Sequence, residues 1–127
     1  MQITLEKLGK RYNREWIFRN LNCEFNSDKS YAILGSNGSG KSTLLQVIAG
    51  NQLPSEGKIN YSNDQVNIAA EQIFHQLSFA APYLELIEEY TLTELIQFQA
   101  HFKPFLSDLS IPEIVQIIGL EKSKDKE

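Results

Sequence analysis

GSNGSGKST, residues 35–43, is the stretch of the sequence that decides the fold. It satisfies the pattern G-x-x-x-x-G-K-S/T, with Gly35, Gly40, Lys41 and Ser42 at the fixed positions. Glycines in this pattern let successive backbone N–H groups approach phosphate oxygens, and the helix that follows adds the positive end of its dipole. The stretch therefore predicts a phosphate-binding loop between a strand and a helix.

The residues on either side of this loop agree with that order. Residues 31–34, YAIL, form a short uninterrupted apolar run, which predicts a strand buried on both faces. After the loop, apolar residues recur at helical spacing from Leu44 to Ile48, and Gly50 is placed to end the helix.

Further strands are predicted around this unit. Residues 2–8 alternate apolar and polar side chains, and residues 16–25 are rich in aromatic and apolar ones, so the two runs predict an antiparallel pair joined by a short turn. Residues 57–62 predict a short strand before a turn, and residues 76–81 predict another strand.

Two helices are predicted in the last third of the chain. Thr91 and Glu94 have the spacing of a capping box, so a helix should begin there and reach about His101. Ser110 and Glu113 repeat the pattern, with Gly119 placed to end the second helix. The charged residues 121–127 predict a solvated segment.

Composition restricts the classes of function. The chain has 127 residues, 12 Lys and Arg against 16 Asp and Glu, and a formal net charge of −4, so we expect one domain and no nucleic-acid partner. No run approaches the roughly 20 apolar residues of a membrane helix, and the N-terminal residues lack the features of a signal peptide. The single Cys23 is expected to be a small buried hydrophobe in a strand.

Each residue type in the loop has a physical role. Lys41 can reach the β- and γ-phosphates of a nucleotide and neutralise charge during phosphoryl transfer, which makes it the candidate catalytic residue. The Ser42 hydroxyl can ligate Mg²⁺, and Thr43 can bond near the α-phosphate. The candidate nucleotide-binding residues of the loop are Gly35, Ser36, Asn37, Gly38, Ser39, Gly40, Lys41, Ser42 and Thr43.

Several segments at matching separations resemble the nucleotide-binding domain of ABC transporters. These are residues 34–50, LGSNGSGKSTLLQVIAG, residues 53–59, LPSEGKI, and residues 91–98, TLTELIQF. The resemblance implies ATP and Mg²⁺ as cofactors, and it places Tyr12 where the family has an aromatic residue that stacks on adenine. Trp16 and Phe18 alternate with charged neighbours, which assigns both of them to the core.

The resemblance also implies the fold class: α/β, a P-loop NTPase of ABC type. It has an antiparallel β subdomain, the start of a parallel core sheet and the start of a helical subdomain. Residues of about 1–83 would hold the β subdomain and the phosphate-loop core, and residues of about 84–127 would begin the helical subdomain. The family's signature loop, metal-binding Asp, catalytic Glu and switch His are expected beyond residue 127, so residues 1–127 are expected to form an incomplete domain with little turnover alone.

The sequence departs from the family at one functional position. Where the family has a glutamine that touches Mg²⁺ and the attacking water, this chain has Ala81 or Pro82, and neither side chain can ligate a metal. Gln72 and Gln76 come too early in the sequence to replace it. We therefore predict no metal ligand from this segment.

The implied function is that of an ATP-binding, ATP-hydrolysing subunit of a transporter. Its expected partners are a transmembrane permease and a second ATP-binding domain, with contact to the permease around residues 83–90. Its expected location is cytoplasmic, peripheral on the inner face of the cell membrane.

Other functions stay open at this point. A non-transport ATPase of the same superfamily, in DNA repair or chromosome organisation, and a truncated nucleotide-binding module without catalysis both fit the loop. A small-molecule kinase is formally possible, whereas a GTPase is disfavoured because neither D-x-x-G nor N-K-x-D occurs. His75, His101 and the carboxylates of residues 85–89 fit ordinary surface or packing roles.

Overall fold

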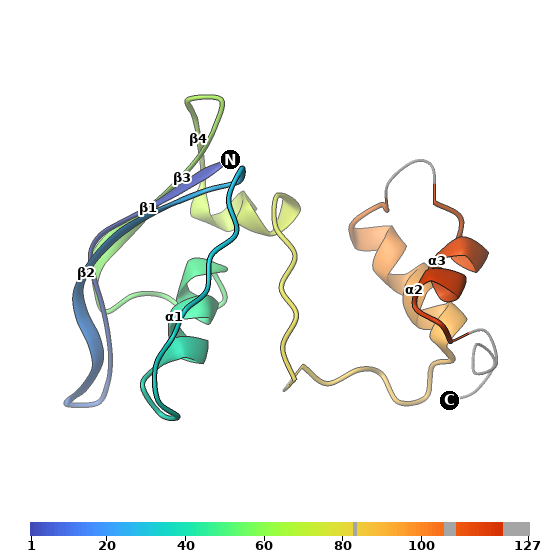
Figure 1. Cartoon of the computed structure of the whole chain (residues 1–127), viewed down its shortest axis with the longest axis horizontal. Coiled ribbons are helices and arrows are strands. Elements are labelled where there is room, and N and C mark those ends of the chain that lie inside the picture. The colour runs from blue at the N-terminus through green and yellow to red at the C-terminus, as the bar shows by residue number, and fades with distance from the viewer. Residues whose placement is uncertain (83, 106–108, 121–127) are drawn as a thin grey trace. The chain divides into compact units, whose positions relative to one another are not determined.

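A computed structural model describes residues 1–82, 84–105 and 109–120 of the chain (Figure 1). The chain divides into two compact units, Met1–Phe79 and Ala80–Glu127, and each is considered by itself. The first unit carries the phosphate loop.

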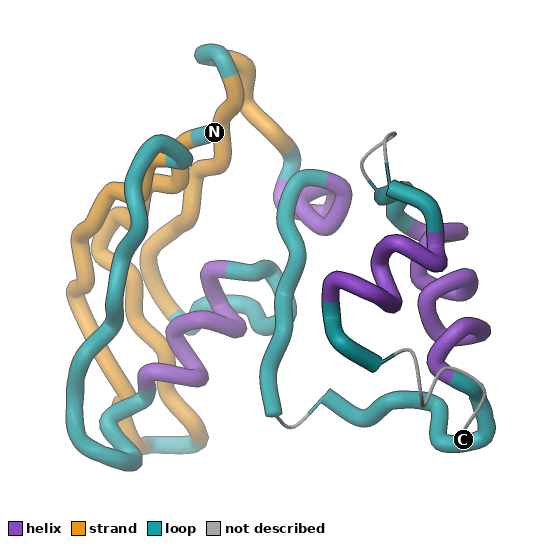
Figure 2. The backbone as a smooth tube through the Cα atoms, turned by 45° about the vertical axis from the view of Figure 1, so that its right-hand side comes forward, coloured by secondary structure: helices purple, strands orange, loops and turns teal. Residues whose placement is uncertain are grey.

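The first unit is built on one antiparallel sheet of four strands in the order β2-β1-β3-β4. Figure 2 shows the strands as its orange segments. The strands are β1 (Gln2–Tyr12), β2 (Glu15–Asn26), β3 (Glu56–Asn63) and β4 (Val66–Ile68). Two-residue turns join β1 to β2 and β3 to β4. Asp64 and Gln65 in the second turn have φ of 47° and 66°, values typical of the tight turns that match strand twist.

One face of this sheet carries the core, and the helix α1 (Lys41–Ile48) packs on it. Val47 of α1 is buried with Leu5 and Leu8 of β1. The end of the helix is fixed by Tyr61 of β3, which is 3% exposed and whose hydroxyl donates a hydrogen bond of 2.8 Å to the Ile48 carbonyl. The 3-10 helix η1 (Ala70–His75) follows β4 and buries Ile73.

Most of the predicted elements of this unit are confirmed. The alternating run at residues 2–8 lies in β1, residues 16–25 lie in β2, and the two strands pair antiparallel as expected. Residues 57–62 lie in β3, and the helix predicted from Leu44 to Ile48 is the second half of α1. The mixed α/β class is therefore confirmed.

The strand predicted at residues 31–34 is wrong. These residues have no regular structure, and the Leu34 side chain is 88% exposed. A strand needs a neighbour for its backbone N–H and C=O groups, and no described strand pairs with this run. Tyr31 instead packs its ring edge-on against Phe25 of β2, with ring centroids 5.0 Å apart.

The strand predicted at residues 76–81 is also wrong, because η1 precedes an irregular segment there. The placement of Cys23 in a strand is confirmed, but its expected burial is not, since the side chain is exposed. Cys23 lies in β2, an edge strand of the sheet, whose residues packed against the core are Phe18, Leu21 and Phe25.

The second unit contains both predicted helices, α2 (Leu92–Phe102) and α3 (Ile111–Ile117). Each begins with the predicted capping box, and Ile96 and Val115 are buried. Backbone and hydroxyl hydrogen bonds from Thr91 lower the pKa of the Glu94 carboxyl. The predicted solvated segment, residues 121–127, lies outside the described residues.

Across the described ranges, no helix is both long enough and apolar enough to cross a membrane.

Candidate nucleotide-binding site

The glycine-rich loop leads directly into the first turn of α1. The Ser39 N–H donates to the Ser36 carbonyl over 3.2 Å, which closes a turn, and the Leu44 N–H donates to the Gly40 carbonyl over 2.8 Å, which opens the helix. Residues 35–39 are exposed, so a ligand can reach their backbone N–H groups. The first turn of α1 contains no acidic side chain that would neutralise its positive end.

Glycine is required at position 40 for two separate reasons. Gly40 has a φ of 88°, in the left-handed region that side chains disfavour. A Cβ placed there would also lie 2.4 Å from Cγ2 of Ile17 in β2. The loop therefore enters α1 in close contact with the sheet, and this contact fixes where the helix begins.

The Lys41 side chain is half-buried and folds over the loop. Its Nζ donates hydrogen bonds of 2.9 Å to the Gly35 carbonyl and 2.7 Å to the Ser36 carbonyl. These bonds hold the charged group at the mouth of the loop, where phosphate oxygens can compete for it as stronger acceptors.

Ser42 and Thr43 occupy the first turn of α1, next to Lys41. Ser42 is exposed and Thr43 is half-buried. The loop thus brings together its backbone N–H groups, one ammonium group and two hydroxyls at the positive end of a helix, an arrangement suited to binding phosphate.

Tyr12 ends β1 and is 46% exposed. Its hydroxyl donates a hydrogen bond of 2.7 Å to Oε1 of Gln52, beyond the end of α1. Lys10 Nζ lies 5.3 Å from the centroid of the Tyr12 ring. Among the described residues, Tyr12 is connected to the loop through Gln52 and α1 rather than by a direct hydrogen bond.

Trp16 and Phe18 do not share one environment. Phe18 packs against the core as predicted, whereas Trp16 lies near two guanidinium groups, with Arg19 at 4.4 Å and Arg11 at 5.5 Å from its ring. The assignment of Trp16 to the core is therefore wrong. A cation, that of Lys10, also lies near the Tyr12 ring, but Tyr12 is 46% exposed whereas Trp16 is half-buried, so Tyr12 offers the more accessible ring for a base.

Gln52 was not predicted from the sequence. Its partner Tyr12 lies 40 positions earlier, and no local pattern marks such a pair. The two histidines have ordinary surroundings. His101 Nδ1 lies 2.9 Å from the Gln97 carbonyl oxygen of its own helix, and the ring centroids of His75 and Phe74 are 3.9 Å apart. Within the part of the chain that the structure describes, no three His, Cys, Asp or Glu side chains are grouped to hold a metal.

Comparison with known proteins gives concordant results. A family model described as ABC transporter matches residues 18–124. The cytochrome c biogenesis ATP-binding export protein CcmA of Agrobacterium fabrum is 30% identical over 128 residues, which cover 94% of this chain and 57% of that protein. The energy-coupling factor transporter ATP-binding protein EcfA1 of Thermotoga maritima is 46% identical over 59 residues, 46% of this chain and 22% of that protein.

Solved structures show the same fold. An ATP-binding subunit of an ABC transporter matches with a TM-score of 0.78 and 23% identity, over 98% of this chain and 53% of that one. A dimeric ATP-binding cassette in a post-hydrolysis state, bound to ADP and Pi, matches with a TM-score of 0.74 and 20% identity, over 96% of this chain and 60% of that one. The chain thus spans little more than half of these relatives' length, and less in the case of EcfA1.

Proposed function

The chain belongs to the ABC transporter family, and from this premise we propose that it is part of an ATP-binding subunit that couples ATP binding and hydrolysis to transport by a membrane partner. The observation that carries this proposal is the loop at residues 35–43, where Lys41 folds over a chain of exposed backbone groups at the start of α1. The names of the relatives, all ATP-binding proteins of transporters or export systems, support it.

The nucleotide would bind along the loop with its phosphates at the start of α1. Lys41 would exchange its carbonyl partners for the β- and γ-phosphates, and Thr43 would bond near the α-phosphate. Tyr12 would stack on the adenine ring, a contact of roughly 1–3 kcal/mol by analogy with bases stacked in nucleic-acid sites.

Mg²⁺ fits the donor set offered by Ser42. The ion is normally held by few protein ligands, with phosphate oxygens and water completing its shell. The exposed Ser42 hydroxyl beside Lys41 supplies one such ligand. Bound there, the ion would offset negative charge on the phosphates, as Lys41 does.

A membrane permease is the proposed partner, and a second ATP-binding domain would complete the pair. Support for a contact at residues 84–90 comes from the second unit itself, where Leu84, Leu86 and Ile87 are 45%, 69% and 37% exposed. The last two of these line a groove of about 450 Å³ with apolar residues of α2 and α3. Tyr83, the first residue of the predicted contact, lies outside the described residues. The proposed location is cytoplasmic, at the inner face of the membrane.

Calorimetric titration of the intact protein with Mg-ATP tests the nucleotide site. Lys41→Ala should weaken binding at least tenfold, because a charge-assisted contact to phosphate is lost. Lys29→Ala removes an exposed lysine of the same first unit and should leave the affinity unchanged. Equal affinities for the Lys41 variant and the wild type would refute the proposed site.

The metal role is tested in the same titration. Ser42→Ala should weaken ATP binding in the presence of Mg²⁺ and change it little when the ion is chelated, since the hydroxyl acts through the metal. An equal loss under both conditions would contradict the assignment of Ser42 as a metal ligand.

A further inference from the structure

Residues 51–55, which we call the return loop, connect the end of α1 to β3 and are tied to β1. The Ser55 N–H donates to the Gly9 carbonyl over 2.8 Å, and Lys10 Nζ donates to the Leu53 carbonyl over 2.8 Å. The Tyr12 hydroxyl adds the third tie, to Gln52. The return loop therefore contacts Gly9, Lys10 and Tyr12, all near the C-terminal end of β1.

These ties fix the Tyr12 ring. The position of its Cα is fixed by the pairing of β1, and its hydroxyl donates a hydrogen bond of 2.7 Å to Gln52. The Lys10 ammonium group lies 5.3 Å from the ring centroid. The side chain is nevertheless 46% exposed, so much of the ring remains reachable from solvent. An exposed aromatic ring on a strand end would otherwise be free to change rotamer.

Gln52 is in turn held by α1. Its Nε2 donates to Oε1 of Gln46, and the backbone N–H groups of Asn51 and Gln52 donate to the Gln46 carbonyl over 2.9 Å and 3.3 Å. Gln46 lies in the helix that begins at Lys41. A continuous set of hydrogen bonds thus runs from α1 through Gln52 to the hydroxyl of Tyr12.

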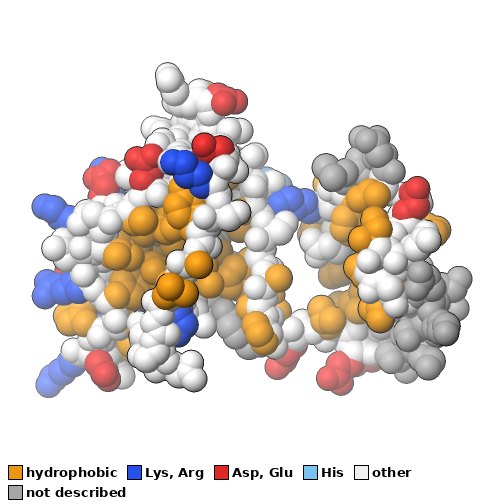
Figure 3. All heavy atoms as spheres, in the orientation of Figure 1, with side chains coloured by type: hydrophobic (Ala, Val, Ile, Leu, Met, Phe, Trp, Pro, Cys, Tyr) orange, Lys and Arg blue, Asp and Glu red, His pale blue; other side chains and the backbone are white. Residues whose placement is uncertain are grey.

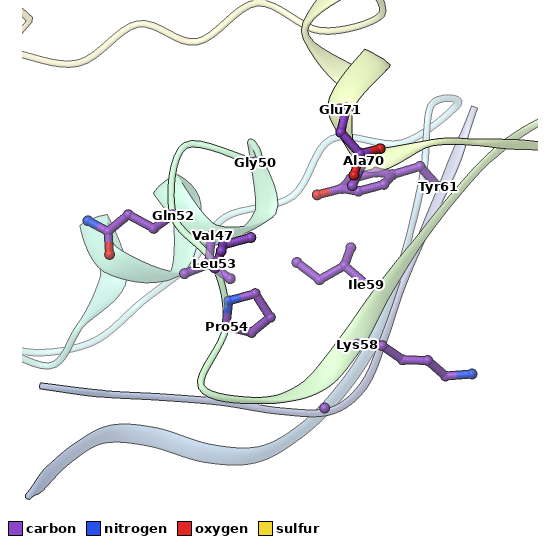
Figure 4. A pocket seen from close by; sticks show the side chains of 11 residues that line it. Val47, Gly50, Gln52, Leu53, Pro54, Lys58, Ile59, Tyr61, Ala70 and Glu71 are labelled. Atoms are coloured by element: carbon purple, nitrogen blue, oxygen red, sulfur yellow. The ribbon is translucent and has the colours of Figure 1, made fainter.

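A cavity of about 340 Å³ is lined by residues of the return loop together with residues of α1, β3 and η1 (Figure 4). Val47, Gln52 and Ile59 are among its lining residues (Figure 4). The Gln52 amide is hydrogen-bonded to polar partners, the Tyr12 hydroxyl and the Gln46 amide oxygen.

We propose that Gln52 is a positioning residue for the nucleotide base: it holds Tyr12 in the orientation that stacks on adenine and ties that orientation to the helix that carries the phosphate-binding Lys41. This inference rests on the proposed function. A side chain ordered before binding loses less conformational entropy when the base arrives, so the hydrogen bond should raise affinity without touching the nucleotide.

The test compares Mg-ATP with inorganic tripolyphosphate, which carries phosphates and no base, in calorimetric titrations of the intact protein. Gln52→Ala and Tyr12→Phe should each weaken Mg-ATP binding about 3- to 10-fold, the effect of one hydrogen bond. Neither substitution should change tripolyphosphate binding. Gln52→Glu keeps an acceptor oxygen for the Tyr12 hydroxyl but loses the donor to Gln46, so it should restore only part of the affinity. The double variant of Gln52→Ala and Tyr12→Phe should be no weaker than either single one.

The outcomes separate this inference from the function on which it rests. If Tyr12→Phe binds Mg-ATP like the wild type, or if Gln52→Ala weakens ATP and tripolyphosphate equally, the positioning role is refuted while Lys41-dependent binding stands. If Tyr12→Ala leaves Mg-ATP affinity unchanged, the stacking role of Tyr12 fails first. Because Tyr12→Phe preserves the ring, it tests the inference even if substitution of Gln52 disturbs the return loop.

Discussion

Replacing Gly40 by alanine should be more damaging than the same change at Gly38, although both residues lie in one loop. Gly38 and Gly40 have φ of 81° and 88°, so alanine at either position has to adopt the left-handed region, at about 1–2 kcal/mol. At Gly38 a Cβ meets nothing within 4 Å. At Gly40 it lies 2.4 Å from Ile17 Cγ2, so the loop, or β2, has to move.

The difference in the free energy of unfolding between Gly40→Ala and Gly38→Ala measures the contact of position 40 with Ile17. Forcing an extra carbon into a packed site typically costs about 1–3 kcal/mol, so Gly40→Ala should lower the free energy of unfolding by about 2–5 kcal/mol in total. Gly38→Ala should lower it by only about 1–2 kcal/mol. Urea unfolding of the intact protein gives both losses in the free energy of unfolding, provided that this free energy falls with urea concentration at the same slope in all variants.

A double variant isolates the cause. Ile17→Ala removes Cγ2, so in the Gly40→Ala background it should cost less than it does alone, with a coupling of about 1 kcal/mol or more. Strictly additive losses, or equal losses for the Gly38 and Gly40 variants, would show that contact with β2 does not fix the start of α1. Nucleotide affinity should fall in parallel, since the same contact places the loop.

Three further outcomes follow from the contacts described above. The pKa of Glu94 in the folded protein lies below its ordinary value of 4.5, so the cap of α2 should be fully formed above pH 4.5 and lost as the pH falls through the folded pKa. Amide hydrogen exchange in the first turn of α2 should show this loss, and Glu94→Gln should abolish its pH dependence. Tyr61→Phe should lower the free energy of unfolding by about 0.5–1.5 kcal/mol in urea titrations, because the Ile48 carbonyl loses its buried donor. Arg19→Ala should cost less than about 1 kcal/mol by the same assay, since its ion pair with Glu56 is exposed, and a larger loss would point to its packing on Trp16.

The elements that the sequence predicts well are those specified by neighbouring residues. Alternation marks β1, the spacing of apolar residues marks α1, and each capping box lies within four consecutive positions. The phosphate loop belongs to this group, because its chemistry is carried by contiguous residues. Glycine, lysine and serine at fixed spacing, before a helix, suffice to place it.

The failures depend on contacts with distant residues. An apolar run such as residues 31–34 indicates burial only if something lies on both sides of it, and the four described strands pair among themselves. The error at Trp16 has another cause. Register shifts between Leu5 and Arg11 interrupt the alternation along the β1–β2 pair, so the position of a residue in the sequence does not tell which face of the sheet its side chain occupies. Gln52 was missed because its role depends on a partner 40 residues away.

The exposed thiol of Cys23 gives this chain a natural attachment point for a spectroscopic label. It is the chain's single cysteine, and it lies in β2 opposite the buried Leu5. A fluorescent or spin label attached there would lie on an edge strand of the sheet without any engineered mutation. Figure 3 shows that hydrophobic side chains gather on one side of the molecule. The label's accessibility to quenchers would then report, in one measurement, whether another protein surface covers that edge when nucleotide or a partner is added.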